Sequence, residues 1–338
     1  MSLPTTTPAH SAELPPPPGR APRSPSSFLV RASKWSRLDT KASPYIYIAP
    51  FFVIFGIFGL FPLIYTGYVA LNDWEVGADT HTFVGLDNFV KILSDNYFWN
   101  AVFNTIGIFV VSTIPQLLLA LMLANALNKR MRGRMWLRMG VLVPNITSVA
   151  AVAILFSQLF ARDFGLINWL LHFVGVSPID WQAHKWTAWL AISTMVDWRW
   201  MGYNALIYLA AMQSIPKDIY ESAALDGASS RRQFWSITVP MLRPTIIFTV
   251  IISTIGGFQL YAEPLLFTGG ASAFLGGTLR QSQTVTMYLM EQFYNKFEYG
   301  DMAAVAWLLF FLILVFSGVN YLITARLESS GKKRGGKK

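Results

Sequence analysis

The chain has 338 residues, of which 53% are hydrophobic and only 13% are charged, and its mean hydropathy is +0.41. Soluble domains carry about 25% charged residues, so this composition excludes an ordinary water-soluble domain. The formal net charge is +9 and there is no cysteine, which excludes disulfides and thiolate-ligated metals. The Lys and Arg residues are spread over separate segments without a recognised nucleic-acid motif, so we expect no nucleic-acid partner.

Residues 1–43 are rich in Pro, Ser, Thr and Ala and have almost no large apolar side chain before Phe28. Such a segment cannot bury enough apolar surface to fold, and we predict a disordered cytoplasmic tail there. At the other end, residues 327–338 form a basic cytoplasmic tail. Its run from Lys332 to Lys338 can also touch anionic membrane lipid, but we favour a solvated tail.

Long apolar runs dominate the rest of the chain. A helix needs about 20 mainly apolar residues to cross a bilayer core. Runs close to or above that length lie at 45–71, 101–127, 136–160, 186–212, 244–260 and 302–324. We therefore predict an all-α integral membrane protein whose domain of six transmembrane helices covers residues 44–326.

Charge predicts the orientation of these helices, because Lys and Arg near the ends of membrane helices stay on the cytoplasmic side. Most of the Lys and Arg residues lie in the segments before the first run and after the second, fourth and sixth runs. The intervening segments together hold more Asp and Glu than Lys and Arg. We therefore expect both termini in the cytoplasm.

The sequence offers little enzyme chemistry. His10, His81, His172 and His184 are scattered and lack the spacing of a metal site. No phosphate-binding loop ending in Lys and Ser or Thr occurs, so any ATP must be bound by another chain. We expect neither an enzyme nor a cofactor, because the side chains do not form a convergent catalytic set.

The polar segment 214–243 between the fourth and fifth runs is the most informative part of the chain. Asp218 and Glu221 favour the positive end of a helix dipole, and Gly227 is typical of a residue that ends a helix. A second short helix extends to Pro240. Small residues around 222–224 would let another protein approach closely, which predicts a docking loop. The same residues would also suit a helix that merely ends at Gly227.

At this segment the chain resembles the permease subunits of ATP-binding-cassette importers. Their motif reads Glu-Ala-Ala, three residues, Gly, nine residues, Ile, one residue, Leu-Pro. Ser222 replaces the first Ala and Val239 replaces the Leu. The coupling residues implied by the resemblance are Glu221, Ser222, Ala223, Ala224, Asp226, Gly227, Ile237 and Pro240. The six runs and the stretch Leu-Asp-Gly-Ala that ends at Ala228 are similar to the carbohydrate branch of that family, which includes maltose and other oligosaccharide permeases.

The resemblance implies a division of labour. The loop 214–243 would sit in a groove of a cytosolic ATPase subunit, with Glu221 in contact and Gly227 shaping the turn. An ATPase dimer, which uses ATP and magnesium, offers two grooves and so implies a second permease subunit, usually a different chain. An external solute-binding protein would deliver the ligand. The family places the chain in a prokaryotic plasma (inner) membrane.

Polar side chains at membrane depth are the default candidates for the solute pathway, because they are costly there without a partner or a cavity. The candidates are Asp197, Trp198, Arg199, Tyr203, Asn204, Gln259, Tyr261 and Glu263. Asp197 and Arg199 are two residues apart and cannot face each other on a helix. Each therefore meets another group, either in an ion pair between helices or subunits or in a sugar contact. Gln259 and Tyr261 suit a sugar, and an aromatic anchor at the interface is the alternative.

The sequence says less about the identity of the transported solute than about the class of transporter. The lack of an Arg or Lys cluster at membrane depth favours a neutral di- or oligosaccharide. The outward segment 264–300 is similar to oligosaccharide permeases, including those for β-glucosides such as cellobiose. Importers of other small solutes such as glycerol-3-phosphate stay open as an alternative. A secondary transporter would need an ion-coupling site and usually an internal repeat, and we find neither.

Overall fold

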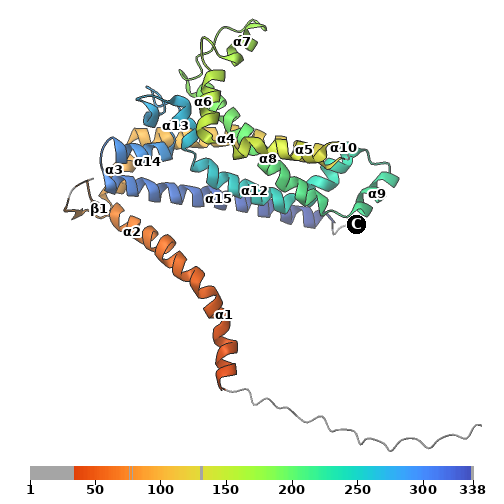
Figure 1. Cartoon of the computed structure of the whole chain (residues 1–338), viewed down its shortest axis with the longest axis horizontal. Coiled ribbons are helices and arrows are strands. Elements are labelled where there is room, and N and C mark those ends of the chain that lie inside the picture. Colours follow the sequence, from red (N-terminus) through yellow and green to blue (C-terminus); the bar gives the residue numbers. More distant parts are fainter. Residues whose placement is uncertain (1–33, 76, 78, 130–131, 336–338) are drawn as a thin grey trace, which may run out of the picture. The chain divides into compact units, whose positions relative to one another are not determined.

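The computed structural model describes residues 34–75, 77, 79–129 and 132–335, which are predominantly helical (Figure 1). Most of the predicted N-terminal tail, residues 1–33, lies outside the described residues, as do residues 336–338. The chain divides into two compact units, Met1–Pro62 and Leu63–Lys338, and each is described by itself.

The first unit contains one long apolar helix. It comprises α1 (Lys34–Phe55) and a π-helical turn η1 (Gly56–Leu60), after which α2 (Phe61–Ala70) begins. Residues 34–43, which the sequence assigns to the tail, are therefore helical here. The stretch Ala42–Ala70 is apolar and long enough to cross a membrane, in agreement with the first predicted run. Its large side chains, such as Phe51 and Phe58, are exposed.

The second unit is built on two parallel helices, α4 (Asn96–Asn128) and α8 (Lys185–Gln213), which make the most extensive helix pairing (Figure 1). Phe103 meets Trp189, and the Ser193 hydroxyl donates to the Ile108 carbonyl at 3.4 Å. Glycine is required at 107, since a Cβ there would lie 2.1 Å from the Trp189 ring. Further along both helices, Leu121 and Leu209 join a common apolar cluster.

Two antiparallel helices complete this bundle, α12 (Arg243–Phe258) and α15 (Tyr299–Gly335). Phe258, at the end of α12, packs against Phe109 in the first half of α4, so α12 runs opposite to α4. The Asn320 amide on α15 donates to Thr254 at 2.9 Å, and the rings of Phe258 and Phe316 lie 4.7 Å apart. Helix α15 continues to Gly335, so the predicted basic tail is helical over its described residues.

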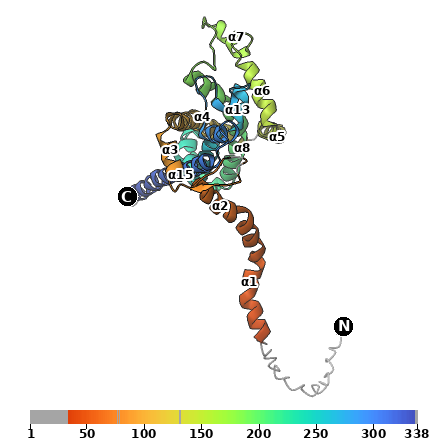
Figure 2. The same ribbon diagram turned by 90° about the vertical axis from the view of Figure 1, so that its left-hand side faces the viewer.

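The predicted third run, 136–160, is not one straight helix. It forms α5 (Arg134–Ile146) and α6 (Val149–Leu159), which meet at an angle of 90°. Pro144 weakens the end of α5, and Thr147 adopts an extended conformation that interrupts the helix. From this bend α6 leads away from the bundle to α7 (Leu166–His172) (Figures 1 and 2).

Short elements close the end of the bundle where α4 begins. They are β1 (Asn72–Asp73), β2 (Thr82–Phe83), α3 (Asp87–Ser94), α13 (Ala262–Thr268), η3 (Ala273–Leu275) and α14 (Val285–Tyr294). The Arg280 guanidinium binds Glu291 through two hydrogen bonds of 2.6 and 2.7 Å. Tyr288 donates to Asp95 at 2.6 Å, and burial, followed by this hydrogen bond, raises the pKa of Tyr288. These contacts hold the end of the bundle together.

Helix length and composition support several membrane spans. Among the described residues, three helices are long and apolar enough to cross a membrane, or up to five if each bent pair is one span. The two bent pairs are α5 with α6, and the short helices 230–241 with α12. Helix α8 is long enough at 29 residues but falls outside this set, and the charged residues Asp197 and Arg199 lie near its middle. The count of six spans stays a prediction.

Candidate functional site

The predicted docking loop begins with α9 (Lys217–Leu225), which Gly227 ends in a Schellman motif. The Ala228 amide donates to the Ala223 carbonyl at 2.9 Å and the Gly227 amide donates to Ala224 at 3.0 Å. Gly227 has a φ of 76°, a left-handed conformation that glycine adopts without steric cost. A Cβ at this position would meet nothing within 4 Å, so backbone conformation rather than space selects glycine.

The second half of the loop is anchored to the bundle. Ser229 caps α10 (Ser230–Gln233), which continues through the π-helical turn η2 (Phe234–Thr238) into α11 (Val239–Met241). Ile237 lies in η2 and Pro240 in α11. Phe234 is buried in the same apolar cluster as Leu209 and Leu242.

One side of α9 faces the loop and the other is exposed. The Tyr220 hydroxyl lies 2.8 Å from that of Thr238, so α9 is tied to η2. The predicted coupling residues Glu221, Ser222, Ala224 and Asp226 are exposed, whereas Ala223, Ile237 and Pro240 are half-buried. The side chain of Leu225 is 91% exposed. This side of α9 is therefore open to solvent.

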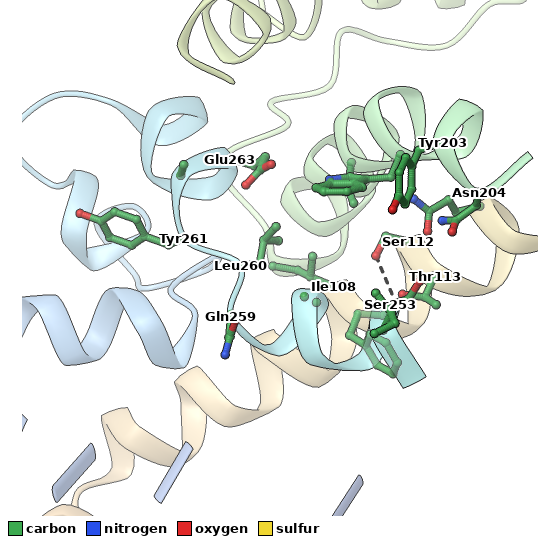
Figure 3. Close-up of a pocket in the computed structure, with 18 residues that line it drawn as sticks. Ile108, Ser112, Thr113, Tyr203, Asn204, Ser253, Gln259, Leu260, Tyr261 and Glu263 are labelled. Carbon is green, nitrogen blue, oxygen red and sulfur yellow. Dashed lines mark hydrogen bonds between the residues drawn. The ribbon is translucent and has the colours of Figure 1, made fainter. Parts of the chain in front are cut away.

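A cavity of about 350 Å³ lies between α4, α8 and α12, next to the start of α13. Its walls combine aromatic, amide and hydroxyl side chains (Figure 3). The predicted pathway residues that line it are Tyr203, Asn204, Gln259, Tyr261 and Glu263. Figure 3 shows Tyr203 and Asn204 near Ser112, while the ring of Tyr261 and the amide of Gln259 point away from that group.

The other three predicted residues do not line this cavity. Arg199 forms an ion pair from α8 to Glu263 on α13, and both side chains are about nine-tenths buried. Of the two alternatives that the sequence left open for Arg199, an ion pair or a sugar contact, the structure shows an ion pair between helices. Trp198 packs against Phe156 of α6. One carboxylate oxygen of Asp197 is buried without a hydrogen-bond partner among the described residues.

Several cavity residues are absent from the sequence-based set. Ser112, Thr113 and Gln116 of α4 and Ser253 of α12 line the wall, as does Trp200 of α8. The spacing of 112, 113 and 116 puts three polar side chains on one side of an apolar helix, and this signal would have identified the wall.

Among the described residues, no group of three His, Asp or Glu side chains gathers closely enough to hold a metal ion.

Residues 108–329 match the family described as "binding-protein-dependent transport system inner membrane component". The chain is 30% identical over 307 residues to the arabinooligosaccharide transport permease AraP of Halalkalibacterium halodurans, covering 88% of this chain and 94% of that protein. It is 33% identical to the trehalose/maltose transport permease MalF of Thermococcus litoralis, with 84% and 94% covered.

Solved structures show the same fold. A chain of a bacterial alginate ABC transporter, crystallised with a periplasmic protein bound to alginate pentasaccharide, superimposes with a TM-score of 0.73. The two chains are 21% identical, and the match covers 87% of this chain and 98% of that one. The fold, the helices able to cross a membrane and the matched family agree with one another. The chain belongs to the inner membrane components of binding-protein-dependent transport systems, the family of multi-pass ABC permease subunits.

Proposed function

We propose that this chain forms half of the pathway through which an ATP-driven importer moves a di- or oligosaccharide across a prokaryotic plasma membrane. The observation that carries the proposal is the exposed loop 214–243, which is anchored to the same helices that line the cavity. The named activities of the similar proteins, which concern arabinooligosaccharides, trehalose and maltose, support the class of solute.

The loop is joined to the cavity by continuous helix. Asn204 lines the cavity and α8 ends at Gln213, nine residues later and therefore about 14 Å along the axis. On the other side, η2 and α11 lead into α12, whose Ser253 and Gly256 also line the cavity. A force applied to the loop would therefore move two walls of the cavity together. In this proposal Glu221, Leu225 and Gly227 present the docking face to a separate ATPase subunit.

The directions of four helices agree with part of the membrane domain of six spans that we propose over residues 44–326. Parallel α4 and α8 fit the second and fourth spans, and antiparallel α12 and α15 fit the fifth and sixth. The loop then lies in the cytoplasm, the side on which we also propose both termini. Partners in this arrangement are an ATPase dimer that binds ATP and magnesium, a second permease subunit and an external solute-binding protein.

The cavity suits a neutral, hydroxyl-rich solute. Among the described side chains that line it, Glu263 is the single charged one, and Arg199 pairs with it. Trp200 and Tyr203 offer aromatic faces, and Gln116 and Asn204 offer amide groups. A volume of about 350 Å³ falls within the range of small-molecule sites. We assign sugar contact to Tyr203 and Asn204, with Gln259 and Tyr261 at the edge of the cavity.

Uptake by the reconstituted transporter tests this function. Proteoliposomes that contain this chain and its accompanying subunits should accumulate a labelled oligosaccharide only with ATP inside and binding protein outside. A protonophore should have no effect. Uptake that persists without ATP but stops with the protonophore would instead identify a secondary transporter.

A further inference from the structure

A groove of about 310 Å³ lies between α5 and α8, separate from the central cavity. Its apolar wall includes Met139, Leu142, Leu206 and Leu209, and its end reaches Gln213, the last residue of α8. The two helices touch at Gly202, where a Cβ would lie 1.9 Å from the Val141 carbonyl oxygen. The groove therefore lies beyond this contact, toward the end of α8 that leads into the docking loop.

Arg138 lines this groove, and part of its guanidinium group is buried. Its Nε and Nη2 atoms are buried and have no hydrogen-bond partner among the described residues. A buried charge without a partner is costly, and no carboxylate of the described chain lines the groove. Nε and Nη2 share one edge of the planar guanidinium, which is the geometry that binds a carboxylate or phosphate through two parallel hydrogen bonds. An anion from outside the described chain would complete this site.

The surroundings of Arg138 indicate which anion fits. Beside the guanidinium, the groove is apolar along several side chains, and Met135 is 73% exposed at its mouth. A molecule with an anionic head and an apolar tail would match the guanidinium at one place and the apolar side chains beside it. Four residues separate Arg134 from Arg138, so Arg138 lies about 6 Å further along α5 than the helix start. That depth corresponds to lipid headgroups if the loop side is cytoplasmic, an orientation that rests on the proposed function.

We propose that this groove binds an anionic phospholipid of the cytoplasmic leaflet. The phosphate oxygens accept hydrogen bonds from Nε and Nη2 of Arg138, and an acyl chain lies along Met139, Leu142 and Leu206. Arg132 and Arg134 raise the local concentration of anionic lipid without contacting the groove, because basic segments attract such lipids to the cytoplasmic surface. The competing occupant, an acidic side chain of the second permease subunit, is distinguished by the experiment below.

The test measures phosphatidylglycerol retained by the purified transporter. Membranes containing phosphatidylglycerol and phosphatidylethanolamine are extracted, the complex is washed in detergent, and bound lipid is counted by native mass spectrometry. Arg138→Gln should weaken phosphatidylglycerol retention about tenfold, the loss expected for a hydrogen-bonded charge pair. Arg132→Gln removes the same charge from the same segment without touching the groove, and it should lower retention far less than Arg138→Gln does. Equal loss in both variants would overturn the site in favour of diffuse surface charge.

Two further variants separate the remaining explanations. Arg138→Lys keeps the charge without the planar edge and should retain less lipid than the unmodified chain but more than Arg138→Gln. Leu206→Trp fills the groove and should reduce retention with Arg138 intact, and added inorganic phosphate should displace none. Unchanged retention in Leu206→Trp, or loss of the second permease subunit rather than lipid from Arg138→Gln, would contradict the proposal. Lipid counting does not depend on uptake, so a wrong solute or ATPase assignment leaves this result interpretable.

Discussion

Gly227 shows how a single backbone angle can set the shape of the docking loop. Its positive φ closes α9 with two capping hydrogen bonds and directs the chain into α10. We expect Gly227→Asp to abolish ATP-driven uptake while the amount of chain in the membrane stays unchanged. A non-glycine residue pays about 1–2 kcal/mol in this conformation, and the new side chain would project from the docking face.

Gly133 provides a matched control. It also has a positive φ, 74°, and a Cβ there would meet nothing within 4 Å. Gly133→Asp therefore carries the same backbone strain outside the docking loop, and it should leave uptake close to normal. Normal uptake by Gly227→Asp, or equal loss in both variants, would count against a specific role for the loop.

The pair of Arg199 and Glu263 leads to a stability prediction. Arg199→Gln leaves a buried carboxylate without its partner, which should cost about 3–5 kcal/mol. The double variant with Glu263→Gln should recover most of that loss, as measured by thermal unfolding of the purified chain in detergent. Additive losses would show that the two side chains do not depend on each other.

At the scale of elements, the tie between α9 and η2 should control how rigidly the docking face is held. Tyr220→Phe removes the hydrogen bond to Thr238, worth about 1 kcal/mol, and should weaken ATPase binding by about fivefold. Thr238→Val should have the same effect, and the double variant should be no worse than either one. Backbone hydrogen exchange over 217–225 should rise in parallel, whereas unchanged exchange would exclude this explanation.

Alanine variants of the cavity residues should differ in how much they raise the solute concentration that gives half-maximal uptake. Tyr203→Ala and Asn204→Ala should raise it by about tenfold, since each removes a group directed at the solute. Gln259→Ala and Tyr261→Ala should change it less, because both side chains point away in Figure 3. The reverse order would place the solute at the end of α12 instead.

These elements also show what could be predicted from the sequence. Apolar runs identified the helices, and the spacing around Gly227 identified a loop of short helices that the structure confirms. The 90° bend after α5 was missed, because hydropathy is the same for a straight or a bent helix. The two-residue spacing of Asp197 and Arg199 correctly excluded a mutual pair. Glu263 could not be named as the partner of Arg199, because that contact depends on how α8 and α13 pack.

In the molecule as a whole, the docking loop lies at one end of the bundle and continuous helices join it to the cavity within the bundle. The family assignment and the fold are independent of the coupling proposal, since they rest on sequence identity and superposition. Coupling requires Leu225 to lie against a separate cytoplasmic subunit. The chain lacks cysteine, so one introduced cysteine reports on one position.

Cross-linking from position 225 in the assembled transporter is the most direct measurement of that placement. Leu225→Cys should cross-link to the ATPase subunit and should resist a membrane-impermeant thiol reagent applied from outside intact cells. Phe164→Cys, at a side chain that is 95% exposed near α7, is the control and should show the opposite pattern. Labelling of the Leu225→Cys thiol from outside, or an active transporter in which that thiol never cross-links to the ATPase, would contradict the account.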